Sequence, residues 1–152
     1  MVDHLKRARR PRTLREGIKL GLLSATAIWL WLVIVDALAG QPLRTFSLLG
    51  GVALFTVLHY ALNVVYGVAA VSVVHGARRE PTLLVGAALV FLLMEIGFAM
   101  LSALLAQVGL GELAWVRIFG GSLLGGAITW TFLARRHPLR QEFGAADAAQ
   151  EE

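Results

Sequence analysis

The chain contains no cysteine and few charged residues for its length. The absence of cysteine excludes disulfides, thiolate metal sites, cysteine-ligated iron–sulfur clusters and thiol nucleophiles. Only 16% of the 152 residues are charged, whereas soluble domains average about 25%, and 57% of the residues are hydrophobic. This composition excludes a soluble enzyme, a disordered chain and a small secreted domain held together by disulfides.

Catalytic signatures are also missing from the sequence. It contains no phosphate-binding P-loop, no G-x-S-x-G nucleophile motif and no H-E-x-x-H zinc motif. The stretch Gly109-Leu110-Gly111 is too short to be a nucleotide-binding fingerprint. We therefore predict no catalytic residue and no cofactor, and the sequence favours a protein that is not an enzyme.

Four long apolar segments account for most of the chain. They cover about residues 18–39, 46–75, 82–107 and 113–134. About 20 helical residues cross the 30 Å hydrocarbon layer of a bilayer, so each segment is long enough to span it. The sequence predicts an all-α membrane protein, an up-down-up-down bundle of four transmembrane helices within residues 17–136. A basic cytoplasmic tail is expected at residues 1–16 and a disordered cytoplasmic tail at residues 137–152.

The positive charges are concentrated on one side of this predicted bundle. Twelve of the fourteen Lys and Arg residues fall in the N-terminal segment, at residues 78–79 and at residues 135–140; Arg44 and Arg117 are the other two. The positive-inside rule then places both termini in the cytoplasm. Because topology explains the pI of 10.3, we expect a lipid bilayer and no nucleic acid as the partner. Only two of the fourteen are Lys, which suggests a GC-rich bacterium and hence its inner membrane.

Two ionisable residues fall near the middle of the predicted spans. With helices at residues 46–74 and 82–107, His59 and Glu95 have nearly the same depth on adjacent antiparallel helices. Charged side chains at mid-membrane are costly, so each is a functional candidate. The polar residues that share their helix faces complete a predicted buried polar centre: His59, Glu95, Asn63, Tyr66, Thr56 and Ser102.

Several functions remain open for this polar centre. It could fix the packing of two helices or form a small binding pocket, which together are the favoured interpretation. A proton-coupled carrier or ion pathway is the alternative, because His and Glu are the usual relay groups. We expect no metal, since one His and one carboxylate are too few ligands within one subunit; only a symmetric dimer would supply more.

Two further features concern the first and last helices. Asp36 and Arg117 each lie about one turn inside the outer ends of their helices, and they form a candidate ion pair whose surface location would limit its strength. The last helix carries a ridge of small residues suited to close helix packing: Gly121, Gly125, Gly126 and Ser122. Its partner could be the first helix, which has its own Gly17 and Gly21. The ridge could instead pack on a second copy of the chain, or on a larger membrane complex in which this protein is an accessory subunit.

Four short segments of the chain carry a resemblance to known proteins. They are residues 31–43 (WLVIVDALAGQPL), 58–60 (LHY), 79–81 (REP) and 135–138 (RRHP). Together they resemble small four-helix integral membrane proteins of GC-rich bacteria, a family of unknown function, over about residues 17–140. The resemblance implies the same membrane topology and no particular activity.

Overall fold

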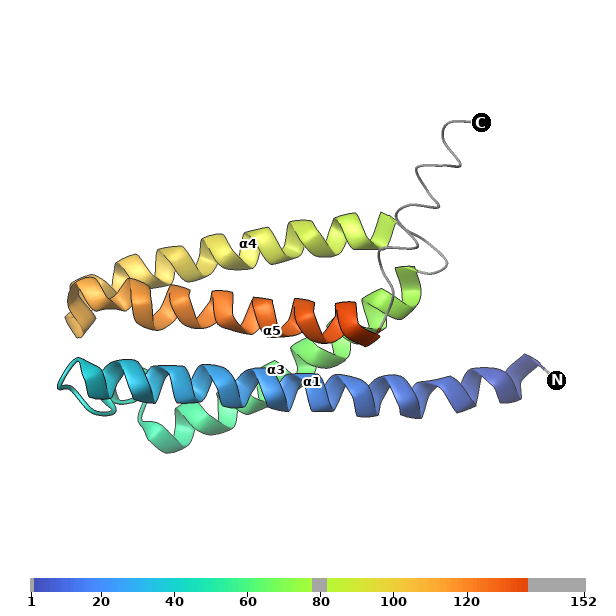
Figure 1. Ribbon diagram of the computed structural model, residues 1–152, viewed down its shortest axis with the longest axis horizontal. Coiled ribbons are helices and arrows are strands. Elements are labelled where there is room, and N and C mark those ends of the chain that lie inside the picture. The colour runs from blue at the N-terminus through green and yellow to red at the C-terminus, as the bar shows by residue number, and fades with distance from the viewer. Residues whose placement is uncertain (1, 78–81, 137–152) are drawn as a thin grey trace.

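The computed structural model describes residues 2–77 and 82–136, and in that part of the chain it contains helices and no strand. Four long helices form the bundle (Figure 1): α1 (Val2–Leu38), α3 (Val52–Ala77), α4 (Thr82–Leu105) and α5 (Gly120–Arg136). Four stretches are long and apolar enough to cross a membrane: Thr13–Leu38, Val52–Ala77, Val85–Leu113 and Trp115–Arg136. The predicted all-α fold with four membrane-spanning helices is therefore confirmed.

The N-terminal basic segment is part of the first helix. α1 begins at Val2 and continues without a break for 37 residues, so the segment predicted as a separate tail extends the first span. At about 1.5 Å per residue, α1 is much longer than a bilayer is thick. The predicted disordered tail, residues 137–152, lies outside the described residues.

The second predicted helix is interrupted near its start. A short helix α2 (Arg44–Leu48) comes first, and α3 begins only at Val52. Gly50 and Gly51, which separate them, have φ angles of 99° and 92°, a backbone conformation that glycine adopts without steric cost. The prediction of one helix from residue 46 was wrong because two glycines with positive φ angles interrupt the helix inside an apolar run.

The turn between α4 and α5 is also built from helical backbone. It consists of a π-helical turn η1 (Ala106–Leu110), a 3-10 turn η2 (Gly111–Leu113) and a second π-helical turn η3 (Trp115–Phe119). Gly109, with φ of 136°, provides the kink. Because η3 leads directly into α5, Arg117 is held at the end of the bundle next to the α1–α2 connection.

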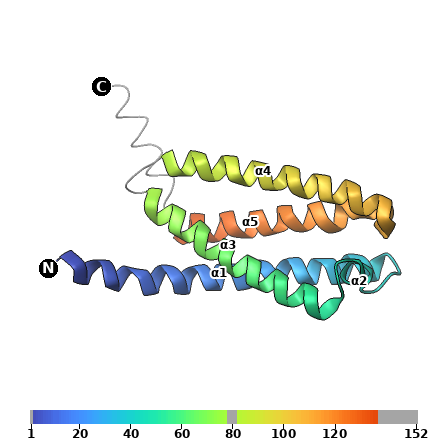
Figure 2. The ribbon, with the colours of Figure 1, turned by 180° about the vertical axis from the view of Figure 1, so that it is seen from behind.

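The helices pack to different extents. α1 lies against both α3 and α5, with α3 crossing α1 obliquely, and α4 lies on the far side of α5 from α1 (Figures 1 and 2). The closest approach is between α1 and α3, where a side chain at Gly67 would meet the backbone oxygen of Gly17 and lie 2.6 Å from the backbone nitrogen of Gly21. The glycines therefore allow these two backbones to touch.

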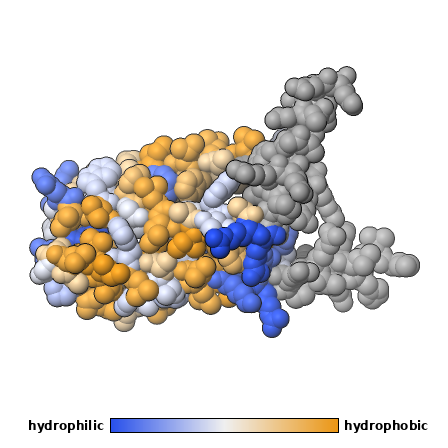
Figure 3. Space-filling view, viewed as in Figure 1, coloured by the Kyte–Doolittle hydropathy of each residue, from blue (hydrophilic) through white to orange (hydrophobic). Residues whose placement is uncertain are grey.

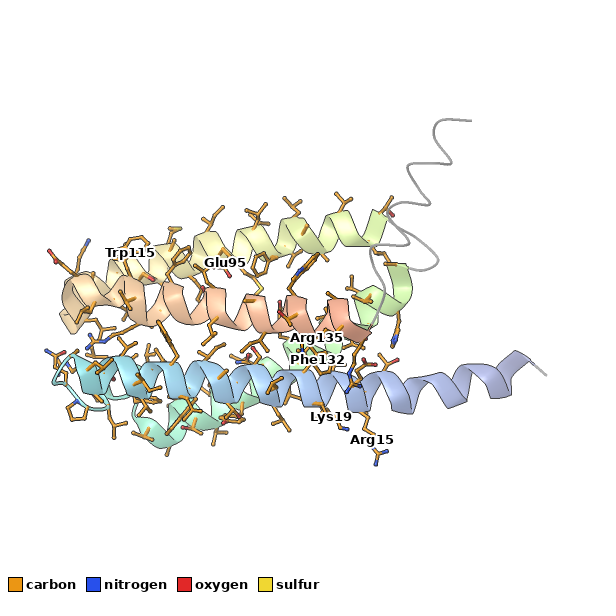
Figure 4. The ribbon with its side chains drawn as sticks, in the orientation of Figure 1. Arg15, Lys19, Glu95, Trp115, Phe132 and Arg135 are labelled. Atoms are coloured by element: carbon orange, nitrogen blue, oxygen red, sulfur yellow. The ribbon has the colours of Figure 1, made fainter. Side chains whose placement is uncertain are left out.

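The surface of the bundle is largely apolar, as expected for a protein embedded in lipid. Figure 3 shows apolar residues over much of one face, with a hydrophilic patch at the end near the N-terminus. The basic side chains Arg15 and Lys19 of α1 and Arg135 and Arg136 of α5 are all exposed. Three of them are labelled in Figure 4, at the same end of the molecule.

Candidate functional site

A cavity of about 450 Å³ lies between the helices, with walls from α1, α3, α4, η3 and α5. Most of its wall is apolar. At its edge, Leu62 and Val65 of α3 and Phe91 and Met94 of α4 are exposed, so the cavity opens sideways between these two helices. Its polar wall residues come from all the surrounding elements: Ser24, His59, Asn63, Tyr66, Glu95, Arg117 and Ser122.

His59 faces α1 through one ring nitrogen and its own helix through the other. The Nε2 atom lies 3.1 Å from the carbonyl oxygen of Ala25, and a carbonyl only accepts, so Nε2 carries the proton. The Nδ1 atom lies 3.4 Å from the amide nitrogen of Asn63, which also donates to the His59 carbonyl oxygen at 2.9 Å. The imidazole is stacked on Phe55, with ring centres 5.0 Å apart. A neutral imidazole with its proton on Nε2 satisfies all these contacts.

Glu95 faces α5 (Figure 4), and its Oε2 lies 2.8 Å from the hydroxyl oxygen of Ser122. The same hydroxyl lies 2.8 Å from the carbonyl oxygen of Phe119. A hydroxyl has one proton to donate, so Ser122 can supply only one of these two contacts. When Ser122 donates to Phe119, the proton between Ser122 and Glu95 must come from the carboxyl group. The arrangement thus fits either the carboxylate or the carboxylic acid form of Glu95.

His59 and Glu95 therefore line one cavity but have different partners, and no hydrogen bond joins them. The expected equal depth also depended on a helix starting at residue 46. Because α3 begins at Val52, His59 lies about 8 Å along the axis from the middle of the helix, whereas Glu95 lies about 2 Å from the middle of α4. Depth alone does not bring two side chains together, because the rotation of each helix decides which neighbour a residue faces.

Among the other members of the predicted polar centre, Thr56 and Tyr66 face two different helices and Ser102 bonds to its own helix. Thr56 accepts a hydrogen bond of 3.0 Å from the indole nitrogen of Trp29 on α1. Tyr66 lines the cavity and lies close to Thr129 of α5. Ser102 is buried but donates to the Phe98 carbonyl oxygen of its own helix, at 2.7 Å, and does not line the cavity. Asn63, Tyr66, His59 and Glu95 are thus the predicted residues that the cavity brings together.

Asp36 and Arg117 form an ion pair, with Nε and Oδ1 2.8 Å apart, and both side chains are 0% exposed. The expected surface location was wrong. The remaining groups of both side chains are also used: Arg117 donates from Nη1 to the Leu110 carbonyl oxygen at 3.0 Å and from Nη2 to Gln41 Oε1 at 3.3 Å. Asp36 accepts from the backbone nitrogen of Thr45 at 2.8 Å and from its hydroxyl at 2.7 Å.

These contacts, which we call the outer knot (Asp36, Gln41, Thr45, Leu110 and Arg117), tie the end of α1 to α2 and to the α4–α5 turn. Thr45 and Gln41 were not predicted as partners. The signal in the sequence is the turn at Gly40 and Pro42: Gln41 lies between these residues and Thr45 follows three residues after Pro42, so the turn folds this segment back toward Asp36 and Arg117. Arg117 also belongs to the cavity wall, so the outer knot bounds one end of the cavity.

The glycine ridge of α5 packs within the chain. Gly121 and Gly125 are buried, and side chains added there would meet Ile28 of α1. Gly126 instead faces Phe91 of α4, to which an added carbon would lie 3.0 Å away. Gly17 and Gly21 of α1 pack on α3, so the two glycine patterns do not meet each other. A single chain already covers this part of the ridge.

The groups around the cavity can be compared with those that catalysis, metal binding or ligand binding requires. Among the described side chains, no hydroxyl is hydrogen-bonded to the ring of His59 across the cavity, so no nucleophile is paired with a base there. No group of three or more His, Asp or Glu residues that could hold a metal ion occurs in the described part of the chain. What the cavity does offer is an apolar wall with a few polar groups, the usual make-up of a small-molecule site.

Comparisons with protein families, with curated proteins and with solved structures gave no match to this chain.

Proposed function

We propose that this protein binds a small apolar or amphiphilic molecule, taken from the surrounding bilayer, in the cavity between α3 and α4. The observation that carries the proposal is a cavity of about 450 Å³ whose edge is formed by exposed apolar side chains of two membrane-spanning helices. Ligand sites usually occupy about 300–1,000 Å³ and often lie between the helices of bundles. A sideways opening gives access to molecules dissolved in the lipid.

The hydrogen bonds of His59 favour binding over a proton relay. A relay needs a group that gains and loses a proton along a path. In this structure one ring nitrogen donates to the Ala25 carbonyl and the other faces the side-chain amide nitrogen of Asn63, an atom that can only donate. Protonation of Nδ1 would place two donors against each other. His59 therefore serves to hold α3 on α1, and the carrier alternative would depend on Glu95 alone.

The distribution of charge supports a bacterial inner membrane with both termini in the cytoplasm. The exposed bases Arg15, Lys19, Arg135 and Arg136 lie at the end of the bundle where α1 extends beyond the span, whereas Arg44 in α2 and Arg117 in η3 are at the other end (Figure 1). Positive charge is retained on the cytoplasmic side of bacterial membranes.

Saturable binding of a labelled neutral amphiphile tests the proposed function. The protein is placed in phosphatidylcholine nanodiscs, and radiolabelled dodecanol is titrated, with empty nanodiscs measuring simple partition into lipid. We expect saturable binding that falls at least about tenfold in Val65→Trp, because the indole fills the opening; tenfold corresponds to about 1.4 kcal/mol.

Val57→Trp is the matched control for this experiment. Val57 is 68% exposed and Val65 is 67% exposed on the same helix, but only Val65 lines the cavity. The control should bind dodecanol like the unsubstituted protein. Binding that never saturates, or an equal loss in both variants, would show that the cavity is not a ligand site.

A further inference from the structure

We infer that the ligand of this cavity carries an amine, so that an ammonium group pairs with Glu95 while its apolar chain lies between α3 and α4. This inference rests on the proposed function and specifies the class of molecule that the site selects. It is carried by the hydrogen-bonding capacity that the polar groups of the cavity wall retain.

The charged groups of the wall differ in whether their charge is already compensated. Arg117 is fully buried, is paired with Asp36 and uses both terminal nitrogens on Leu110 and Gln41. Both ring nitrogens of His59 are engaged. Glu95, by contrast, is only partly buried and has no ion-pair partner among the described residues. Of these three groups, the carboxyl group of Glu95 is therefore the one that is left for a ligand.

Glu95 and Asn63, which line the same cavity, both keep spare hydrogen-bond acceptor atoms. Ser122 occupies Oε2 of Glu95, and no described residue is hydrogen-bonded to Oε1. The side-chain nitrogen of Asn63 contacts His59, which leaves the side-chain oxygen of Asn63 as a free acceptor. A ligand head that brings donors fits these atoms, and an ammonium group has three. A fatty acid would bring a second carboxylate to the same place and would be repelled.

Aromatic rings on α4 add to this preference. Phe91, Glu95 and Phe98 follow a spacing of four and three residues, so all three share one face of the helix, and all three line the cavity. A cation beside Glu95 thus has a ring one turn away in each direction. Attraction between a cation and an aromatic face is stronger where water is excluded.

The proton balance of binding is consistent with the Ser122 contact. If a neutral amine meets the acid form of Glu95, the carboxyl O–H bond breaks and an N–H bond forms, giving an ammonium and a carboxylate. Ser122 then donates its proton to Oε2, the arrangement that the 2.8 Å contact allows. No further reactant is needed.

Three ligands with the same chain test the inference: dodecylamine, dodecanol and dodecanoate, each titrated onto the unsubstituted protein in phosphatidylcholine nanodiscs. We expect dodecylamine to bind about tenfold or more tightly than dodecanol, since hydrogen bonds between charged groups are roughly twice as strong as neutral ones, and dodecanoate to bind most weakly. Equal affinity for the amine and the alcohol would overturn the inference and leave the proposed pocket standing. No saturable binding of any of the three would overturn both.

Substitution of the carboxyl group locates the preference. Glu95→Gln should lower dodecylamine affinity about tenfold and leave dodecanol affinity within about twofold, because the amide keeps the shape of the side chain but not its charge. Glu112→Gln, a change to an exposed acid outside the cavity, should alter neither. If Glu95→Gln keeps the preference for the amine, the inference is wrong. Should that variant not fold, the three-ligand comparison decides the matter without it.

Discussion

α1 and α4 are both membrane-spanning helices, yet they are held in the bundle in different ways. In the most apolar 18-residue stretch of the α1 span, 33% is buried within the protein. In the matching stretch of the span that contains α4, only 11% is buried. α1 touches α3 through the backbone at Gly17 and Gly21 and receives hydrogen bonds from His59 and Tyr60. α4 exposes apolar side chains on several faces, among them Val85, Leu89, Leu92, Leu93, Ile96 and Met100.

This difference explains where the cavity lies. Van der Waals contact between close backbones and hydrogen bonds between helices are what hold helices together in lipid, where apolar surface alone gives no advantage. The layer of α1, α3 and α5 has both close packing at glycines and hydrogen bonds between helices. Among the described residues, α4 is joined to α5 by the hydrogen bond between Glu95 and Ser122, and the cavity separates part of α4 from α3. A tightly packed layer and a loosely packed wall thus create a site that lipid-soluble molecules can enter.

The largest effect is expected from breaking the outer knot, which anchors the α4–α5 turn to α1. Asp36→Asn leaves the buried guanidinium of Arg117 without its counter-charge, and removing one partner of a buried ion pair costs about 3–5 kcal/mol. The free energy of unfolding in detergent, measured by denaturant titration, should fall by that amount. Arg44→Gln removes an exposed charge at the same end and should change stability by less than about 0.5 kcal/mol. A loss below about 1 kcal/mol in Asp36→Asn would show that the pair does not anchor the turn.

A smaller loss of stability is expected from Gly67→Ala, which tests the close packing of α1 on α3. The added methyl group would lie 2.6 Å from the Gly21 nitrogen, and backbone cannot move aside as a flexible side chain can. Overpacking of this kind typically costs about 1–3 kcal/mol. The same denaturant titration measures it. An unchanged stability would mean that α1 and α3 separate easily, and the contrast with α4 would disappear.

The smallest effect on stability is expected from Gly97→Ala on α4, and this substitution should stabilise the protein. A side chain added at Gly97 would meet nothing within 4 Å, so the substitution brings only the higher helix propensity of alanine, about 0.5–1 kcal/mol. A slight rise in the denaturation midpoint is the predicted result. Destabilisation would indicate that a partner covers this side of α4 in the membrane.

The sequence was sufficient for the all-α fold and for four polar residues that line the cavity, His59, Asn63, Tyr66 and Glu95, but not for their contacts. Long uncharged runs define membrane spans because the length and the solvent are fixed by the bilayer. The break before α3 was missed because Gly50 and Gly51 carry no polarity that would separate them from the apolar run around them.

Residue depth could be estimated from the sequence, whereas helix rotation could not. His59 faces α1 because Gly67 allows α3 to approach Gly17 and Gly21, and this contact fixes which side of α3 points to α4. Their similar depth made Asp36 and Arg117 a candidate ion pair, but did not decide that they pair. Their burial depends on how residues 41–45 fold back over them, a property of the tertiary structure.

The location of a bound amphiphile shows directly whether the cavity between α3 and α4 is the binding site. Dodecanol that carries a diazirine in its chain is photolysed with the protein in nanodiscs, and the adducts are mapped by mass spectrometry. We expect labelling concentrated on the α4 residues that line the cavity: Phe91, Met94, Glu95, Phe98 and Leu101. Leu92, Leu93 and Ile96 are exposed on the same helix outside the cavity and should react far less. Equal labelling of the two sets would mean that the amphiphile only coats the surface of α4 and that the cavity does not bind it.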